Sequence, residues 1–170
     1  MIASEPERKR SAMNEKATDS SGLASWLVYR AGTHLCALPL QDVVEIMRML
    51  PIEQLSGAPS YVRGLCIIRG SPVPVVDTGS LIGDHATRAG RLVAVRIGGR
   101  IVALAVEAVV GIRAIAAQAS AQLPPLLRDA AIETVEAIGT LDAELLLLLR
   151  TARIVPEDMF SRLDALETVT

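Results

Sequence analysis

The sequence has few aromatic residues and no excess of positive charge. Its 170 residues include one Trp, two Tyr and one Phe, and its formal net charge is −2. Proteins that bind nucleic acids usually present a basic face or aromatic side chains on which bases stack. The composition therefore argues against a nucleic-acid partner.

Long hydrophobic runs are also missing. The longest unbroken apolar run near the C-terminus covers residues 145–149, whereas a membrane-spanning helix needs about 20 residues. Residues 1–21 mix both charge signs and lack the apolar segment of a secretory signal. We expect a soluble, cytoplasmic protein without direct membrane insertion. Residues 1–21 are predicted to be a disordered tail and residues 22–170 a single domain.

Residues suited to metal binding or catalysis are scarce. The chain has two Cys and two His, with no Cys-x-x-Cys or His-x-x-x-His spacing. Cys36 and Cys66 lie inside apolar segments, which is typical of buried, reduced thiols. No glycine-rich loop stands between a strand and a helix, where it could hold a phosphate. We expect no catalytic residue, no metal and no cofactor.

What the sequence does contain is a series of short apolar segments separated by turns. The clearest case is residues 62–81, where two apolar runs flank the turn residues Arg69-Gly70-Ser71-Pro72. Both runs are apolar at nearly every position, which predicts strands covered on both faces. Asp77 ends the second strand. We favour a helix cap over a catalytic carboxylate for Asp77, because a short helical turn is predicted from Thr78 onward.

This pattern occurs twice along the chain. A shift of 66 aligns residues 26–46 with 92–112 and makes seven positions identical, and a shift of 73 aligns 62–82 with 135–155 without gaps. We interpret the chain as two copies of a unit of about five strands, and such a unit can close into a small barrel.

The predicted fold is therefore mainly β, with two small five-stranded barrels in a pseudo-repeat. The barrel-forming halves are expected at roughly residues 24–83 and 91–155. Pro156 is expected to open a short C-terminal helix over residues 156–168. The seam between two barrels is the expected binding surface, since partners often bind between domains.

Residues 43–49 form the most informative predicted strand. Alternation places Val44 and Ile46 on one face, which we take as the inner one. The other face carries Val43, Glu45 and Met47. This second face is neither polar nor core-like, so it either packs on the other barrel or forms an adhesive strip to which Glu45 adds specificity.

Arg69 lies beside a glycine in the predicted turn. It is either a solvated turn residue or a contact to a partner, since arginine is enriched at interface hot spots.

Taken together, these segments resemble the CheW family, the coupling proteins of bacterial chemotaxis. The resemblance covers residues 24–155 and the final helix and rests on an ordered set of motifs: Ala37-Leu38-Pro39, Val43-Val44-Glu45-Ile46, Tyr61-Val62-Arg63-Gly64, Arg69-Gly70, Val73-Pro74-Val75-Val76-Asp77 and Leu104-Ala105-Val106-Glu107. It implies two SH3-like β-barrels and no enzymatic activity.

The resemblance also implies partners. A CheW-like adaptor bridges the cytoplasmic tip of a methyl-accepting chemoreceptor and the regulatory domain of a CheA-type histidine kinase, and it can bind other CheW-like domains. By analogy with the family, the receptor-binding residues are Val43, Glu45 and Arg69. The resemblance assigns no kinase-binding residue.

Some positions depart from the family pattern. Ile67 stands where the family usually has Asn, and Arg150, the repeat counterpart of Asp77, stands where an acidic residue is common. An alternative is therefore a CheW-like paralogue for a pathway controlling pili, gliding or another chemosensory output. Two further alternatives are a small-molecule binder or enzyme that uses the seam as a pocket, and a self-associating structural β-module.

Overall fold

The apolar segments form the strands that the sequence predicts. A computed structural model describes residues 23–83, 85–116, 121–122, 135–155 and 157–167. Its strands are β1 Leu23–Ala31, β2 His34–Pro39, β3 Val43–Arg48, β4 Val62–Ile68, β5 Ser71–Asp77, β6 Arg91–Ile97, β7 Arg100–Val106, β8 Ala108–Ala116, β9 Ala121–Gln122, β10 Val135–Leu141 and β11 Glu144–Leu149. Its helices are η1 Leu40–Asp42, α2 Thr78–Leu81, η2 Thr151–Arg153 and α4 Glu157–Glu167. The predicted tail at residues 1–21 lies outside the described residues.

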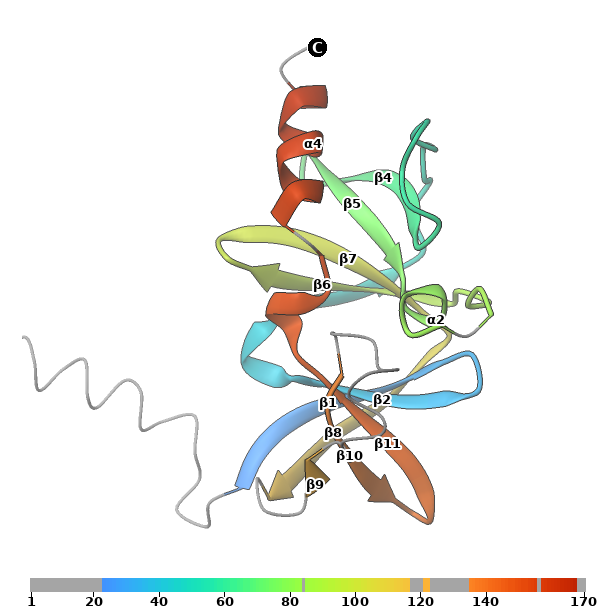
Figure 1. Ribbon diagram of the computed structural model, residues 1–170, viewed down its shortest axis with the longest axis vertical. Coiled ribbons are helices and arrows are strands. Elements are labelled where there is room, and N and C mark those ends of the chain that lie inside the picture. The colour runs from blue at the N-terminus through green and yellow to red at the C-terminus, as the bar shows by residue number, and fades with distance from the viewer. Residues whose placement is uncertain (1–22, 84, 117–120, 123–134, 156, 168–170) are drawn as a thin grey trace, which may run out of the picture.

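The strands form two sheets, and together they confirm a mainly β fold of two SH3-like barrels. The first sheet has the order β8-β1-β2-β11-β10-β9 and the second sheet β3-β6-β7-β5-β4. In Figure 1 the first sheet lies below the second, with α4 at the top of the view. The short C-terminal helix is also confirmed.

The two barrels do not correspond to the two halves of the sequence, so that expectation is wrong. By the repeat alignment, β1–β3 match β6–β8, and β4–β5 match β10–β11. The first sheet combines β1 and β2 with β8, β10 and β11, and the second combines β6 and β7 with β3, β4 and β5. Each repeat therefore gives its first two strands to one barrel and the other three to the other.

The connection after the second strand of each repeat explains this exchange. Pro39 ends β2, and the three-residue helix η1 carries the chain onward instead of turning it back. β3 consequently pairs with β6 of the other repeat. At the equivalent point only Glu107 separates β7 from β8, and its N–H donates to the carbonyl of Arg30 on β1, 2.8 Å away. β8 then pairs with β1, which makes the exchange reciprocal.

The hydrophobic core has three parts: one cluster between the two sheets and a smaller cluster on the opposite face of each sheet. A shared cluster joins buried residues of β1 and β2 to buried residues of β6 and β7, among them Leu27, Leu38, Val93 and Leu104. Two smaller clusters cover the opposite faces of these strands. The interior of the expected seam is therefore packed core rather than an open binding surface. Burial on both faces also explains why these strands are apolar at nearly every position.

The edge strand β3 differs from the expectation in which of its residues are covered. Val44 and Ile46 are 42% and 44% exposed, while Val43 and Met47 pack against buried clusters. Alternation shows which residues share a face but not which face points inward. A register shift between Val43 and Glu45 also breaks the alternation, so Val43 faces the shared core and Met47 faces the smaller cluster on the opposite side of the sheet.

Candidate interaction groove

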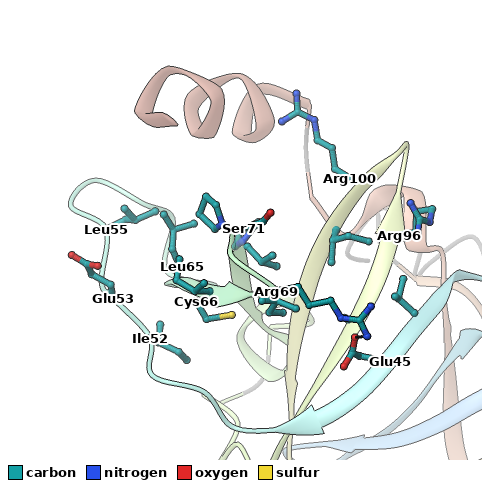
Figure 2. A pocket seen from close by; sticks show the side chains of 18 of the residues that line it. Glu45, Ile52, Glu53, Leu55, Leu65, Cys66, Arg69, Ser71, Arg96 and Arg100 are labelled. Carbon is teal, nitrogen blue, oxygen red and sulfur yellow. Dashed lines mark ion pairs between the residues drawn. The ribbon is translucent and has the colours of Figure 1, made fainter. Parts of the chain in front are cut away.

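A groove of about 1190 Å³ opens on the outer side of the second sheet. Its walls come from β3, the loop that follows β3, the β4–β5 hairpin, β6, β7 and α4. The apolar part of its lining includes Ile52, Leu55, Leu65, Val73 and Phe160. Figure 2 shows the loop residues on one side of the groove and the arginines Arg69, Arg96 and Arg100 on the other.

Gly64 on β4, which follows Arg63, allows the loop after β3 to pack closely against the sheet. The backbone of Glu53 exchanges two hydrogen bonds with Leu65 on β4, each 2.8 Å long. Gly64 has φ +142°, and a Cβ atom at this position would lie 2.0 Å from the carbonyl oxygen of Glu53. Only glycine permits both this backbone conformation and this close approach.

Two ion pairs mark the rim of the groove. Glu45 on β3 pairs with Arg69 of the β4–β5 turn at 2.7 Å, with side chains 32% and 80% exposed. Arg100 at the start of β7 pairs with Asp164 on α4 at 2.5 Å. The Arg100 guanidinium also lies 5.2 Å from the ring centroid of Phe160. The second pair connects α4 to the sheet and so shapes the upper wall of the groove.

The structure brings together two of the three predicted receptor-binding residues. Glu45 and Arg69 both line the groove and contact each other. Val43 packs against the shared core and is not part of the lining. Its neighbour Val44 does line the groove.

The sequence did not point to several other residues that line the groove. Ile67, expected to be covered, is 61% exposed and lies in the lining, so the prediction of strands covered on both faces is wrong for this position. Arg96, Arg100 and Phe160 also line the groove. The repeat alignment could have drawn attention to Arg96, which matches Arg30.

Asp77 lies outside the groove and has a structural role, as favoured from the sequence. Its carboxylate accepts hydrogen bonds from the backbone N–H of Ser80 at 3.0 Å, which caps α2, and from the N–H of Thr87 at 3.0 Å. Arg63 donates to it through Nε at 2.7 Å and also donates to the carbonyl of Thr87. Burial opposes ionisation of this carboxyl, but these bonds outweigh burial and lower the pKa of Asp77.

The two thiols are buried, as predicted. Burial raises the pKa of Cys36 to about 12 and also raises the pKa of Cys66. Within the described residues, no three His, Cys, Asp or Glu side chains lie close enough together to hold a metal ion. None of the helices in the described part of the chain is long and apolar enough to span a membrane.

Two interlocked β-barrels with an apolar groove rimmed by ion pairs have the form of a protein-interaction domain. A family model of the CheW-like domain matches residues 25–159. The chain therefore belongs to the CheW-like family, whose members act as scaffolds or adaptors.

Similar proteins agree with this assignment. Protein FrzA of Myxococcus xanthus is 32% identical over 136 residues, which cover 74% of this chain and 84% of FrzA. The crystal structure of the scaffolding protein TtCheW from Thermoanaerobacter tengcongensis matches with a TM-score of 0.68 at 22% identity, covering 76% of this chain and 90% of that one. The second likeness supports the fold.

Proposed function

We propose that this protein is a non-enzymatic, cytoplasmic adaptor that couples the tip of a chemoreceptor to the regulatory domain of a CheA-type histidine kinase. The observation that carries the proposal is the groove, because its rim holds Glu45 and Arg69 at positions that the family resemblance assigns to receptor contacts. Chemoreceptor tips are helical, and an amphipathic helix binds by laying its apolar face into such a groove.

The apolar lining and the charged rim of the groove would contribute to receptor binding in different ways. The apolar lining, with Val44 and Ile67 exposed, provides buried contact area. The ion pair at the rim gives orientation and selectivity more than affinity. Val43 supports β3 from the core side and keeps Glu45 at the rim. We assign no residues to the kinase interface.

Coupling of this kind requires no chemistry on the adaptor. One rigid body that holds receptor and kinase together transmits a change when its contacts with either partner differ between two states. The continuous core between the two sheets supplies such a body.

A specific observation favours a paralogue as the second candidate. Ile67 replaces the Asn usual in the family, and it is exposed within the groove, so the groove is more apolar than the family pattern implies. Together with the 32% identity to FrzA, this favours a chemosensory pathway with another output, such as pili or gliding.

The test is a calorimetric titration with the receptor-tip fragment and with the kinase regulatory domain of the same organism. We expect the wild-type protein to bind both. Glu45→Lys and Arg69→Glu should weaken receptor binding about tenfold, as for a charge contact at an interface, while thermal midpoints stay nearly unchanged. A folded protein that binds neither fragment contradicts the proposal.

A matched pair of variants separates the groove from general surface effects. Val44 lines the groove and is 42% exposed, and its repeat counterpart Val110 on β8 is 43% exposed but is not part of the groove. Val44→Ser should weaken receptor binding and Val110→Ser should not. Equal effects of both changes would place the receptor elsewhere.

A further inference from the structure

The β4–β5 hairpin of the second sheet and the β10–β11 hairpin of the first sheet are equivalent by the repeat. The β4–β5 turn has positive φ at Arg69 and Gly70, and the β10–β11 turn has positive φ at Asp142 and Ala143. β5 runs parallel to β7 with Val75 opposite Ala103, and β11 runs parallel to β2 with Leu148 opposite Ala37. These registers agree with the sequence shifts of 66 and 73. The surroundings of one end can therefore be compared with those of the other, residue by residue.

The second sheet contains an arginine that lacks the acidic partners of its repeat counterpart. In the first sheet, Arg30 forms a two-pronged pair with Glu144, with both N–O distances 3.1 Å, and Glu107 adds to the favourable charge environment. The equivalent arginine in the second sheet is Arg96. The positions equivalent to Glu144 and Glu107 hold Ser71 and Gln41, which are neutral.

Arg96 finds no replacement nearby. Within the described part of the chain its side chain makes no hydrogen bond or ion pair. The carboxylates on its side of the groove are engaged, because Glu45 pairs with Arg69 and Asp164 with Arg100. Arg96 is exposed and lines the groove, and Figure 2 shows it on the same side as those two arginines.

We propose that Arg96 recognises a carboxylate on the segment that fills the groove. The partner segment is apolar on the face that enters the groove and carries Asp or Glu at its edge, where it takes the place that Glu144 has beside Arg30. The proposal rests on the proposed receptor-binding function and adds the chemistry that the partner must present.

Arg96 should contribute more to discrimination between partner segments than to overall affinity. In the free protein Arg96 is solvated, so it costs little to leave unpaired. When an apolar segment covers the groove, the guanidinium loses water, and a segment without an acid leaves a desolvated charge without a partner. A carboxylate restores the two-pronged geometry that arginine forms best.

The test measures binding of the receptor-tip fragment to Arg96→Gln and Ser71→Glu. Arg96→Gln should weaken binding about tenfold, because a close interfacial charge pair is lost. Ser71→Glu places an acid where the first sheet has Glu144, so it should satisfy Arg96 within the chain and weaken binding by a similar factor. Ser71→Gln, which adds a side chain of the same size as Glu without the charge, controls for crowding of the groove and should weaken binding clearly less than Ser71→Glu.

A control and a partner scan complete the design. Arg30→Gln removes the equivalent arginine of the first sheet and should leave affinity unchanged. Each Asp and Glu of the receptor fragment is then changed to Asn or Gln, and one of these changes should have no further effect in Arg96→Gln. Unchanged affinity in Arg96→Gln, or in Ser71→Glu, overturns the carboxylate proposal while the adaptor role stands. A wild-type protein that binds neither the receptor fragment nor the kinase domain overturns both proposals.

Discussion

Replacing Asp77 should destabilise the protein strongly, even though the residue lies outside the groove. Asp77→Ala removes the cap of α2, which is worth about 1 kcal/mol. It leaves the buried N–H of Thr87 without its acceptor, at a cost of about 1–3 kcal/mol. It also leaves the guanidinium of Arg63, 29% exposed, without its carboxylate, for roughly 1 kcal/mol more after solvent screening. The expected loss in the free energy of unfolding is about 3–5 kcal/mol.

Asp77→Asn separates these contributions. Its amide oxygen can still accept hydrogen bonds from the N–H groups of Ser80 and Thr87, but it carries no charge for Arg63. The expected loss is therefore smaller, about 1–2 kcal/mol. Urea denaturation followed by the fluorescence of Trp26 measures both losses, and a change of 3–5 kcal/mol moves the midpoint by roughly 2 M. Glu144→Ala, which removes the exposed pair with Arg30, is the control and should leave the midpoint nearly unchanged.

The stability that Asp77 contributes should decrease at acidic pH. The pKa of Asp77 is lower in the folded protein than its ordinary value of 3.8. Its ionised form therefore contributes stability that is complete above about pH 4 and is lost as the pH falls through the folded-state pKa. The stability difference between wild type and Asp77→Asn should shrink over that acidic range. A loss below 1 kcal/mol for Asp77→Ala at neutral pH would refute the structural role of this carboxylate.

Two further predictions concern the loop wall and the thiols. Gly64→Ala should lower the free energy of unfolding by more than about 3 kcal/mol or prevent folding, because its Cβ would overlap the carbonyl of Glu53. Gly98 has φ +54° but open space around it, so Gly98→Ala should cost only about 1 kcal/mol in the same urea titration. Cys36 and Cys66 should react with a maleimide at pH 8 only on unfolding, since both are buried and the pKa of Cys36 is about 12; rapid labelling of Cys36 in the folded protein would contradict its burial.

The local structure follows from the sequence because its causes are local. Strand length, β-branched residues and turn residues such as Gly70 predict the hairpin within residues 62–81. The bounds predicted for the strand at residues 43–49 and for the C-terminal helix agree with β3 and α4 within one residue at each end. The capping role of Asp77 followed in the same way, from a polar residue at the junction of a strand and a helical turn.

The errors arose where distant segments decide the outcome. Which strand pairs with β3 depends on the path of η1 through space, so the exchange between repeats has no signal within either repeat. Which residues of β3 are covered depends on the register shift between Val43 and Glu45, and that shift arises in the pairing of β3 with the distant strand β6. The groove needs the approach of Glu53 to Gly64 and the docking of α4 through Arg100, which are contacts between residues far apart in sequence.

The differences between the two repeats give the strongest argument about function. The buried strands β1 and β2 resemble β6 and β7, because both pairs must fill one shared core. The hairpin ends carry no such constraint, and there the repeats differ in charge: Asp142 and Glu144 at one end correspond to Arg69 and Ser71 at the other. The first end satisfies its own arginine, and the second leaves Arg96 at the mouth of an apolar groove. This asymmetry between two similar units supports the proposal that a partner binds at the second end.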